Sequence, residues 1–567
     1  MKRCPKCSRI YADETLNFCL EDGEWLRGDP ETVEPTTAIL HETDAMGDAP
    51  TRAQIHLTDR SGDLPGGNPK SFQDSSNSYK KLAIAALVLT FVGLAGFLGY
   101  RNYSSGDWGR IGSIAVLPFE NRSGSPDADY LSDGLADSLI YRLTQLPDLK
   151  VSPTNSVMRY KGAPTDVAQI ANDLNVDAVM SGRLVQRGDD LNISVQLTDA
   201  RSQKLIWAEQ YDRKMSDLLA TQREIAATIA DKLQLKLAGD QTKGITKKYT
   251  TSNEAYRSYL EGRFYWNKRT AENLDKAIAQ FQQAADADPS FALAYVGLAD
   301  CYLVLEQYAG RPSSGTLPKA RAAALRALEI DDSLAEAHAS LGMVNYQLWQ
   351  PAEAEKEYKR AIELNPTYAT AHHWYSLLLT GAGRSDEAMA EIERAQQADT
   401  LSPIVAINVG GQLLQRGDFD AATVQYHKAL DLNPNFPRAI SDLGLIDAKR
   451  GHEQEAIAQL QKAAELTGRA NEELAFLGYG YAILGKRSEA LAVLKELEAR
   501  HARRESPAMY PAAIYGALGE KDEAFAWLEK DFRTHTGLLP NSATLPIYDT
   551  LRDDPRYTDL FRRMGFR

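Results

Sequence analysis

Small and bulky apolar residues recur along the second half of the chain with a fixed period of thirty-four residues. Alanine keeps this interval, and a larger apolar residue stands four positions after each alanine except the first. A small residue stands twelve positions before each alanine from the second onward. A period of this length holds two helices of about fifteen residues each and the turns between them. The alanines are Ala320, Ala354, Ala388, Ala422, Ala456, Ala490 and Ala524.

The spacing also predicts how the two helices of a repeat pack. Gly342 on the first helix and Ala354 on the second allow a close approach, and Tyr358 fills the remaining space. Pro366 ends the second helix, because proline has no backbone N–H to continue the hydrogen-bond ladder. This pattern resembles the tetratricopeptide repeat (TPR), and eight repeats are expected from about residue 253 to 534. The expected fold is therefore mainly α, a TPR α-solenoid; the alternative is an irregular helical domain.

A different pattern occupies residues 111–240, where apolar runs alternate between helical and strand spacing. Its expected element order is β-α-β-α-β-β-β-α, which is an α/β pattern. Polar turns such as Gly188-Asp189-Asp190 separate the alternating strands. Seven of these eight elements are expected at 114–119, 130–146, 167–174, 177–185, 191–199, 204–212 and 216–237.

Four short motifs in this region resemble the TolB-like amino-terminal domain, over about 110 residues. They are Ser113-Ile114-Ala115-Val116-Leu117-Pro118-Phe119-Glu120-Asn121, Asp133-Gly134-Leu135, Val179-x-Ser181-Gly182 and Trp207-Ala208-Glu209-x-Tyr211-Asp212-Arg213. The resemblance implies a domain that follows a membrane helix and precedes TPR units in membrane-bound regulators. Those regulators carry an adenylate cyclase, a Ser/Thr kinase or a winged-helix DNA-binding domain in the cytoplasm. This chain has only a small cysteine-containing module in that place, so a catalytic role does not carry over.

Residues 82–100, LAIAALVLTFVGLAGFLGY, contain no charge over nineteen positions. That length spans the hydrocarbon core of a bilayer as a helix, and the alternative is a buried core helix. Lys80 and Lys81 on one side against Arg101 on the other favour a cytoplasmic amino terminus. The expected localisation is the inner (cytoplasmic) membrane, single-pass, with the TolB-like and TPR domains periplasmic or extracytoplasmic. Residues 28–79 are polar and are expected to form a disordered linker.

Three of the four cysteines lie in residues 1–27, which indicates a local metal site rather than a disulfide framework. Cys4 and Cys7 form a Cys-x2-Cys turn, and Cys19 with Asp22 forms a second turn. Zinc accepts sulfur and carboxylate ligands, so one structural zinc is expected, with Asp22 as the candidate fourth ligand. The module resembles half of a zinc ribbon; the alternative is a metal-free turn module with reduced thiols.

Charge and missing motifs exclude other functions. The net charge of −13 opposes attraction to nucleic acid, and residues 1–27 offer no basic surface, so no direct nucleic-acid binding is expected. The sequence has no G-x4-G-K-[ST] phosphate loop, no G-x-S-x-G elbow and no H-E-x-x-H helix. We therefore expect no enzyme activity, no catalytic residues and no cofactor besides the zinc.

The resemblance to TPR proteins implies a concave groove, lined by the second, fifth, ninth and twelfth residues of each repeat. These positions are mostly apolar here, which favours an amphipathic helix or an apolar extended peptide as partner; the alternative is that some pack against neighbouring repeats. Residues 535–567 are expected to cap the last repeat. The predicted function is a membrane-anchored scaffold or sensor for protein interactions; the alternative is a signalling or transcription regulator that acts through the zinc-ribbon-like module. The groove residues are Met343, Tyr346, Thr370, His373, Leu377, Ile407, Leu414, Arg438, Ser441, Leu445 and Tyr479.

Overall fold

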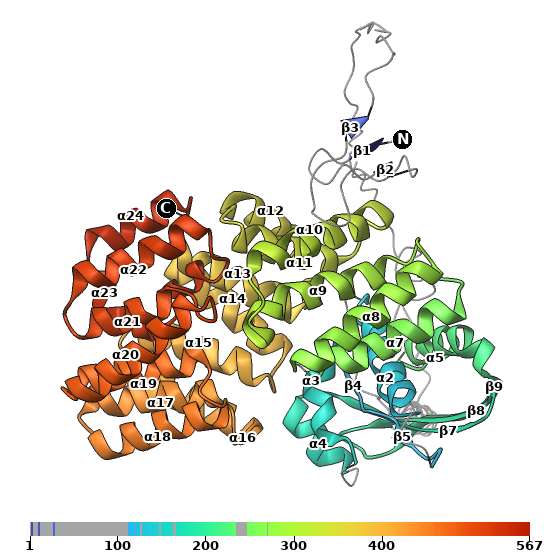
Figure 1. Cartoon of the computed structure of the whole chain (residues 1–567). Helices are drawn as coiled ribbons and strands as arrows, with labels where there is room; N and C mark the ends of the chain where they lie inside the picture. The colour runs from blue at the N-terminus through green and yellow to red at the C-terminus, as the bar shows by residue number, and fades with distance from the viewer. Residues whose placement is uncertain are drawn as a thin grey trace, which may run out of the picture. The chain divides into compact units, whose positions relative to one another are not determined.

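A computed structural model describes two long stretches of the chain with short gaps, and three short segments near the amino terminus (Figure 1). The short segments are the strands β1 (Lys2–Arg3), β2 (Ile10–Tyr11) and β3 (Arg27–Gly28), which form an antiparallel sheet of order β2-β1-β3. The predicted zinc ligands and most of the predicted linker lie outside the described residues, so both stay predictions. Residues 2–3, 10–11, 27–28, 111–124, 128–146, 149–162, 166–233, 247–268 and 270–566 are described.

The predicted localisation needs a correction. The assignment to the inner membrane rested on residues 82–100, which lie outside the described residues. Among the helices of the described residues, none is both long enough and apolar enough to cross a membrane. The structure therefore does not support a single-pass membrane protein, and that localisation is withdrawn.

Residues 111–233 form a sheet with helices packed on it. The elements β4, α2, β6, α4, β7, β8, β9 and α5 follow the order that the sequence pattern predicts, and the short elements β5, α3, η2 and η3 are additional. The sheet order is β6-β4-β7-β8-β9, with β5 also paired to β7. β4 runs parallel to β6 and β7, whereas β7, β8 and β9 form an antiparallel meander. The strands are β4 (Ser113–Val116), β5 (Glu120–Asn121), β6 (Lys150–Val151), β7 (Ala178–Arg187), β8 (Asp190–Asp199) and β9 (Leu205–Lys214); the helices are α2 (Asp129–Leu143), α3 (Thr154–Val157), η2 (Met158–Tyr160), α4 (Val167–Leu174), η3 (Met215–Asp217) and α5 (Leu218–Lys232).

Residue alternation along β8 decides which side of the meander is the core. Leu191 and Ile193 are buried, while Asn192 between them is partly exposed, because side chains of a strand alternate between its two faces. Leu184 of β7 and Tyr211 of β9 pair with Ile193, so all three lie on the buried face. The helices α2 and α5 contact each other, the sheet and the first helix of the array, α7 (Asn253–Trp266). The meander thus has one covered face and one polar face.

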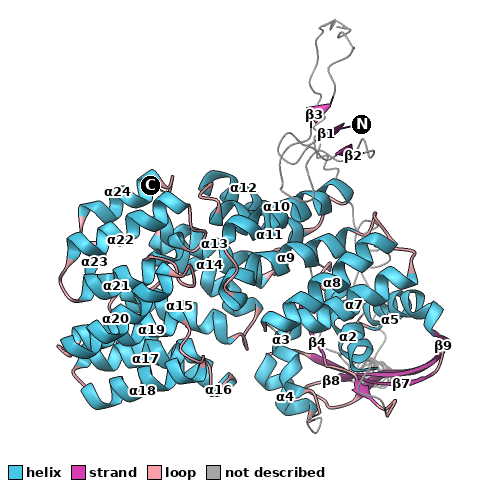
Figure 2. Cartoon of the chain, in the orientation of Figure 1, coloured by secondary structure: helices cyan, strands magenta, loops and turns pink. Residues whose placement is uncertain are grey.

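Sixteen helices, α7 to α22, form eight antiparallel pairs in residues 253–534 of the described chain (Figure 2). This confirms the predicted TPR repeats. The first helices of the pairs are α7, α9 (Ala292–Ala309), α11 (Ala335–Gln347), α13 (Ala369–Gly381), α15 (Pro403–Gln415), α17 (Pro437–Arg450), α19 (Asn471–Ile483) and α21 (Met509–Ala517). The second helices are α8 (Ala271–Ala287), α10 (Ser313–Ile330), α12 (Pro351–Leu364), α14 (Ser385–Ala398), α16 (Phe419–Leu432), α18 (Glu453–Leu466), α20 (Arg487–Ala502) and α22 (Lys521–Thr534).

Within a repeat, the small residue and the bulky residue meet as the period predicts. A Cβ added to Gly342 would lie 2.7 Å from Tyr358, and one added to Gly410 would lie 2.7 Å from Tyr426. The Tyr358 and Tyr426 side chains are fully buried. Such close approach leaves no space for a larger residue at either glycine, because protein cores are close-packed.

The α/β region and the first repeats share one hydrophobic core. Gly134 of α2 faces Leu260 of α7, and a Cβ at Gly134 would lie 2.9 Å from the Leu260 Cβ. Next to this contact, Arg263 donates two hydrogen bonds to Asp137 of α2, at 2.8 and 3.1 Å. A second contact joins the Ser156 hydroxyl to Asp399, after α14. The junction therefore combines close packing with a largely buried ion pair, and the two regions fold as neighbours.

Helix propensity alone predicts that replacing Gly134 by alanine stabilises the protein, whereas the close contact with Leu260 predicts the opposite. Gly134→Ala should lower the free energy of unfolding by about 1–3 kcal/mol, because the added methyl overpacks the α2–α7 contact. Gly315→Ala in α10 is the matched control, since no atom lies within 4 Å of its added Cβ; it should raise stability by up to about 1 kcal/mol. Urea unfolding of the two variants measures both effects. A stabilised Gly134→Ala protein would mean that α2 and α7 do not pack this closely.

Candidate functional site

The end of the chain lies along the first helices of the repeats. We call residues 538–566 the C-terminal segment, and the helix surface that it contacts the inner face. The segment contacts α13, α15, α19 and α21, and its side chains also reach α11 and α17. It contains η4 (Leu539–Ala543), η5 (Pro546–Tyr548), α23 (Asp549–Arg552) and α24 (Pro555–Arg563).

Polar and aromatic contacts hold the segment at both ends of the inner face. Tyr346 and Phe566 meet edge to face, with ring centroids 5.5 Å apart. A Cβ added to Gly381 would lie 3.1 Å from the Phe566 ring, so the small residue in α13 admits the segment. The polar contacts are Tyr346 Oη to Asn541 Oδ1 (3.3 Å), Gln415 Nε2 to the Ala543 carbonyl (3.0 Å), Lys449 Nζ to Asp549 Oδ2 (2.6 Å) and Tyr548 Oη to the Met509 carbonyl (2.8 Å).

Eleven apolar side chains of the segment are buried, while Leu538 at its start is partly exposed. Each of the eleven is at most 4% exposed, which is the burial of core residues. The segment also contacts the last repeat, through Arg563 and Glu529 of α22. The segment thus covers the inner face as well as the last repeat, whereas the sequence predicted contact with the last repeat alone. The buried side chains are Leu539, Ala543, Leu545, Ile547, Tyr548, Leu551, Tyr557, Leu560, Phe561, Met564 and Phe566.

The predicted groove residues divide into two groups by burial. Seven are buried, because the C-terminal segment or neighbouring helices cover them: Met343, Tyr346, Ile407, Leu414, Ser441, Leu445 and Tyr479. Four are partly exposed: Thr370, His373, Leu377 and Arg438. We call these four the uncovered strip. Burial lowers the pKa of His373 to about 4, so this imidazole is neutral at physiological pH.

One end of the uncovered strip is rich in carboxylates. Arg438 Nε donates to Asp442 at 3.0 Å, and its Nη1 donates to Glu472 at 2.9 Å. The guanidinium also lies over the Phe476 ring, 4.7 Å from its centroid. Sequence reasoning included Arg438 but missed its partners. The signal was present in the repeat phase, since Glu472 follows Arg438 by one full period.

The carboxylates of this end hold protons more tightly than usual. Burial raises the pKa of Asp442 to about 6, against the attraction of Arg438. Burial and the charge of Glu472 together raise the pKa of Glu473 to about 8. Burial is the largest cause of each shift, because it disfavours the charged form of a carboxyl group.

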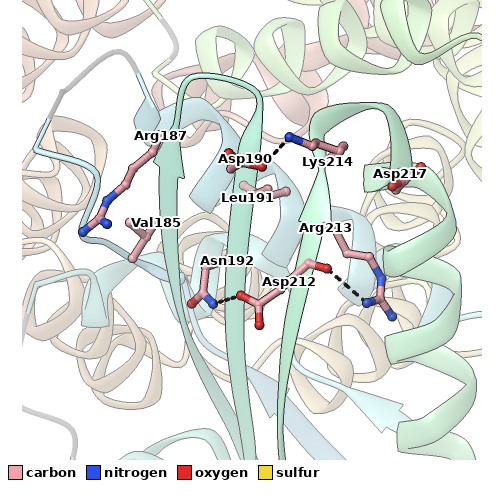
Figure 3. Close-up of a pocket in the computed structure, with 9 residues that line it drawn as sticks. All are labelled: Val185, Arg187, Asp190, Leu191, Asn192, Asp212, Arg213, Lys214 and Asp217. Carbon is pink, nitrogen blue, oxygen red and sulfur yellow. Dashed lines mark hydrogen bonds and ion pairs between the residues drawn. The ribbon is translucent and has the colours of Figure 1, made fainter.

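A separate open cavity of about 630 Å³ lies at the hairpin end of the β7–β8–β9 meander (Figure 3). Its basic and acidic side chains are largely paired with each other or with the backbone. Lys214 bonds Asp190 at 2.6 Å, and Asn192 donates to Asp212. Gly188 forms the turn of this hairpin with φ at +62°, which favours glycine. Arg213 pairs with Glu224 of α5, so most charges of the cavity already have a partner and the cavity suggests no particular ligand.

Models of known families match two parts of the chain. A model described as the second domain of HilA/YgeH-like transcriptional regulators matches residues 110–228. Tetratricopeptide repeat models match residues 266–335 and 335–368. The second of these matches starts at Ala335, the first residue of α11, as the repeat phase requires.

Whole-protein comparisons show partial similarity. A Rhizobium meliloti (strain 1021) protein described as an adenylate cyclase is 30% identical over 245 residues, which are 43% of this chain and 42% of that protein. The transcriptional regulator HilA of Salmonella typhimurium is 24% identical over 294 residues, 51% of each protein. The solved structure of PilF from Pseudomonas aeruginosa is 26% identical, covers 37% of this chain and 94% of that one, and has a TM-score of 0.30. This chain thus spans about half the length of the first two relatives.

The burial of the C-terminal segment predicts that one of its side chains is essential for stability. Tyr548→Ala should lower the free energy of unfolding by about 3–5 kcal/mol, because it removes a fully buried ring and its hydrogen bond. Leu491→Ala, at a 40% exposed position of α20, should change stability by at most about 0.5 kcal/mol. Urea unfolding followed by circular dichroism measures both. Equal, small effects would show that the segment does not pack on the inner face.

The shifted pKa of Glu473 predicts a dependence of stability on pH. The unfolded chain ionises this group above its ordinary pKa of 4.5, and the folded chain only near 8. Between these values the folded state binds the extra proton, so the free energy of unfolding should fall as pH rises, by a few kcal/mol at most. Glu473→Gln should flatten this part of the profile, because the amide stays neutral. Urea unfolding at several pH values compares the variant with the natural protein; parallel profiles would contradict the shift.

Proposed function

We propose that this chain is a non-catalytic TPR module that binds a partner protein through the uncovered strip of its inner face. The observation that supports the proposal is the division of that face. The C-terminal segment or neighbouring helices bury seven of the predicted groove positions, while Thr370, His373 and Leu377 stay partly exposed. A partner would contact a narrow strip rather than an open groove. An extended peptide fits such a strip better than a whole helix.

The α/β region is a second folded region, beside the TPR array, that partner binding could affect. Its core is continuous with that of the first repeats, and Arg263 bonds Asp137 across the junction. We propose that a partner on the array acts on this region, as in a scaffold or sensor. The TolB-like resemblance agrees with such a regulatory role.

The partial relatives also support regulation rather than catalysis. One is described as an adenylate cyclase and the other as a transcriptional regulator, yet each shares about half its length with this chain. Because the two relatives differ in output, the half that each shares with this chain is better suited to control an output than to perform it. The function of this chain is therefore proposed from the shared region, and not from the activity of either relative.

Two leucines of the predicted groove should now behave differently. Leu377→Glu should spare the fold and weaken partner capture at least tenfold, because the partly exposed side chain tolerates a charge but its apolar contact with the partner is lost. Leu445→Glu should instead unfold the protein, since Leu445 is fully buried. The assay is affinity purification with the full chain as bait, with circular dichroism on each variant. Undiminished capture by a folded Leu377→Glu protein would overturn the proposed surface.

A second candidate function is regulation of transcription, favoured by the match of residues 110–228 to the HilA/YgeH-like domain. The two candidates differ in whether the chain associates with promoter DNA. Mobility-shift assays with the full chain and duplex DNA at two salt concentrations separate them. A direct DNA contact would weaken steeply with salt, because it releases counterions from the phosphates. If the chain does not change the mobility of the DNA even at low salt, any effect on transcription would require another protein.

A further inference from the structure

The second helices of the first five repeats all end at an aspartate or an asparagine. In each of them the side chain accepts a hydrogen bond from the backbone N–H two residues further on, which shapes the turn into the next repeat. Because asparagine makes this bond in repeats 3 and 5, the turn does not require a charge. The five residues are Asp288, Asp331, Asn365, Asp399 and Asn433, which end α8, α10, α12, α14 and α16.

The three aspartates have a second role, because the α/β region or its connection to α7 donates a hydrogen bond to each. Neither asparagine receives such a bond from residues 111–252 in the described part of the chain. Carboxylates therefore stand at those helix ends where the array holds the α/β region. The donors are Thr250 Oγ1 to Asp288 (2.5 Å), Lys247 Nζ to Asp331 (2.6 Å) and Ser156 Oγ of α3 to Asp399.

The contact at Asp399 differs from the other two in its position along the chain. Lys247 and Thr250 directly precede α7, so chain connectivity keeps them beside the first repeats. Ser156 and Asp399 are 243 residues apart. The α/β region thus meets the array at α7, where α2 packs on it, and again at the end of repeat 4. The second attachment closes a loop that contains the first four repeats.

The second attachment is small and its charges are poorly compensated. Ser156 is 2% exposed and Asp399 is 7% exposed, while Leu401 beside them packs on the core shared by the α/β region and the first repeats. Burial raises the pKa of Asp399, against the Ser156 hydrogen bond and the attraction of Lys150 and Lys428. Burial also lowers the pKa of both lysines. The lost hydration thus outweighs the attraction of these charges, so the contact adds little net stability and opens at a small cost.

The helix that ends at Asp399 belongs to the same repeat as most of the uncovered strip. Three of the four residues of the strip lie on α13, and α14 is its partner helix in repeat 4. His372, next to His373 of the strip, joins the two helices, because its Nδ1 lies 2.5 Å from Glu391 Oε2 on α14. A shift of α13 would therefore carry α14 and Asp399 with it.

We propose that the Ser156–Asp399 contact is a separable attachment of the α/β region to the array, and that a partner on the uncovered strip opens it. The structure holds the contact closed, so opening is the change available to it. Binding and opening are then linked, and a partner that favours the open contact binds more tightly to a variant that is already open. This inference rests on the proposed function, because it describes how a partner on the strip acts on the α/β region.

The test is amide hydrogen exchange, followed by mass spectrometry, on the full chain and its variants. Ser156→Asp sets a second carboxylate against Asp399, so exchange of residues 150–157 and 399–402 should become at least about tenfold faster. Exchange of α2 and α7 should stay as in the natural protein, because the first attachment remains. The matched control is Asn155→Asp, which adds the same charge at the exposed neighbouring position of α3 and should leave all four segments unchanged.

A milder variant guards against a folding defect in Ser156→Asp. Ser156→Ala removes the donor without adding a charge and leaves the Asp399 carboxylate buried without this hydrogen bond. Exchange should become about fivefold faster in the same two segments. Unchanged exchange in both variants would overturn the separable attachment. Faster exchange that extends equally through α2 and α7 would also overturn it, because the α/β region would then detach or unfold as one unit.

The link to the partner is tested by affinity purification, where the partner is the protein that Leu377→Glu fails to capture. Ser156→Asp should capture about threefold more of this protein than the natural chain does. If Leu377→Glu loses the partner but an opened Ser156→Asp protein captures no more than the natural chain, the proposed function stands and the link falls. If Leu377→Glu captures as much as the natural chain, the proposed function falls, and the exchange experiment alone decides whether the attachment is separable.

Discussion

The contact between the C-terminal segment and the inner face links parts of the array that a solenoid would otherwise leave independent. In most repeat proteins each repeat contacts only its neighbours, and stability is close to a sum over adjacent pairs. Here Phe566 and Asn541 both contact Tyr346 of α11, and just before the segment the Gly537 amide donates to the Ser313 hydroxyl of α10. Residues more than two hundred positions apart therefore share one core. The repeats that contact the segment should therefore unfold together, because detaching the segment from one of them also detaches it from the others.

The same contact determines which functions remain open to the array. A groove filled with Tyr548, Leu551 and Phe561 cannot also accept a partner helix on those positions. What stays partly exposed is the uncovered strip of Thr370, His373, Leu377 and Arg438. The chain has thus used its own apolar residues where a partner would otherwise bind. The strip would then determine which partner binds, because a partner that buries the polar and charged groups of the strip without pairing them binds weakly.

The junction between the α/β region and the array also depends on close packing and on paired charges. Gly134 allows α2 to touch α7, and Asp137 accepts both hydrogen bonds from Arg263. A largely buried ion pair adds little stability compared with apolar packing, because both charges lose their hydration. The ion pair does disfavour any packing of α2 on α7 that would leave Arg263 or Asp137 buried without the other. The pair therefore fixes the register of α2 on α7, and this favours transmission of changes between the two regions.

The sequence by itself determined the repeats, because small and bulky residues at a thirty-four-residue interval can only be satisfied by pairs of helices. It also determined the order of elements in residues 111–233, since strand and helix periods differ and the turns between them are polar. It did not determine where the C-terminal segment lies. The apolar positions of Tyr548, Leu551 and Phe561 predict a buried face but do not say what covers it. Nor could it show that the Ser156 hydroxyl meets Asp399, because that approach depends on the superhelical path of several repeats. Local patterns fix helices and their immediate partners, whereas contacts across the array depend on small rotations that accumulate from repeat to repeat, and only the tertiary structure decides them.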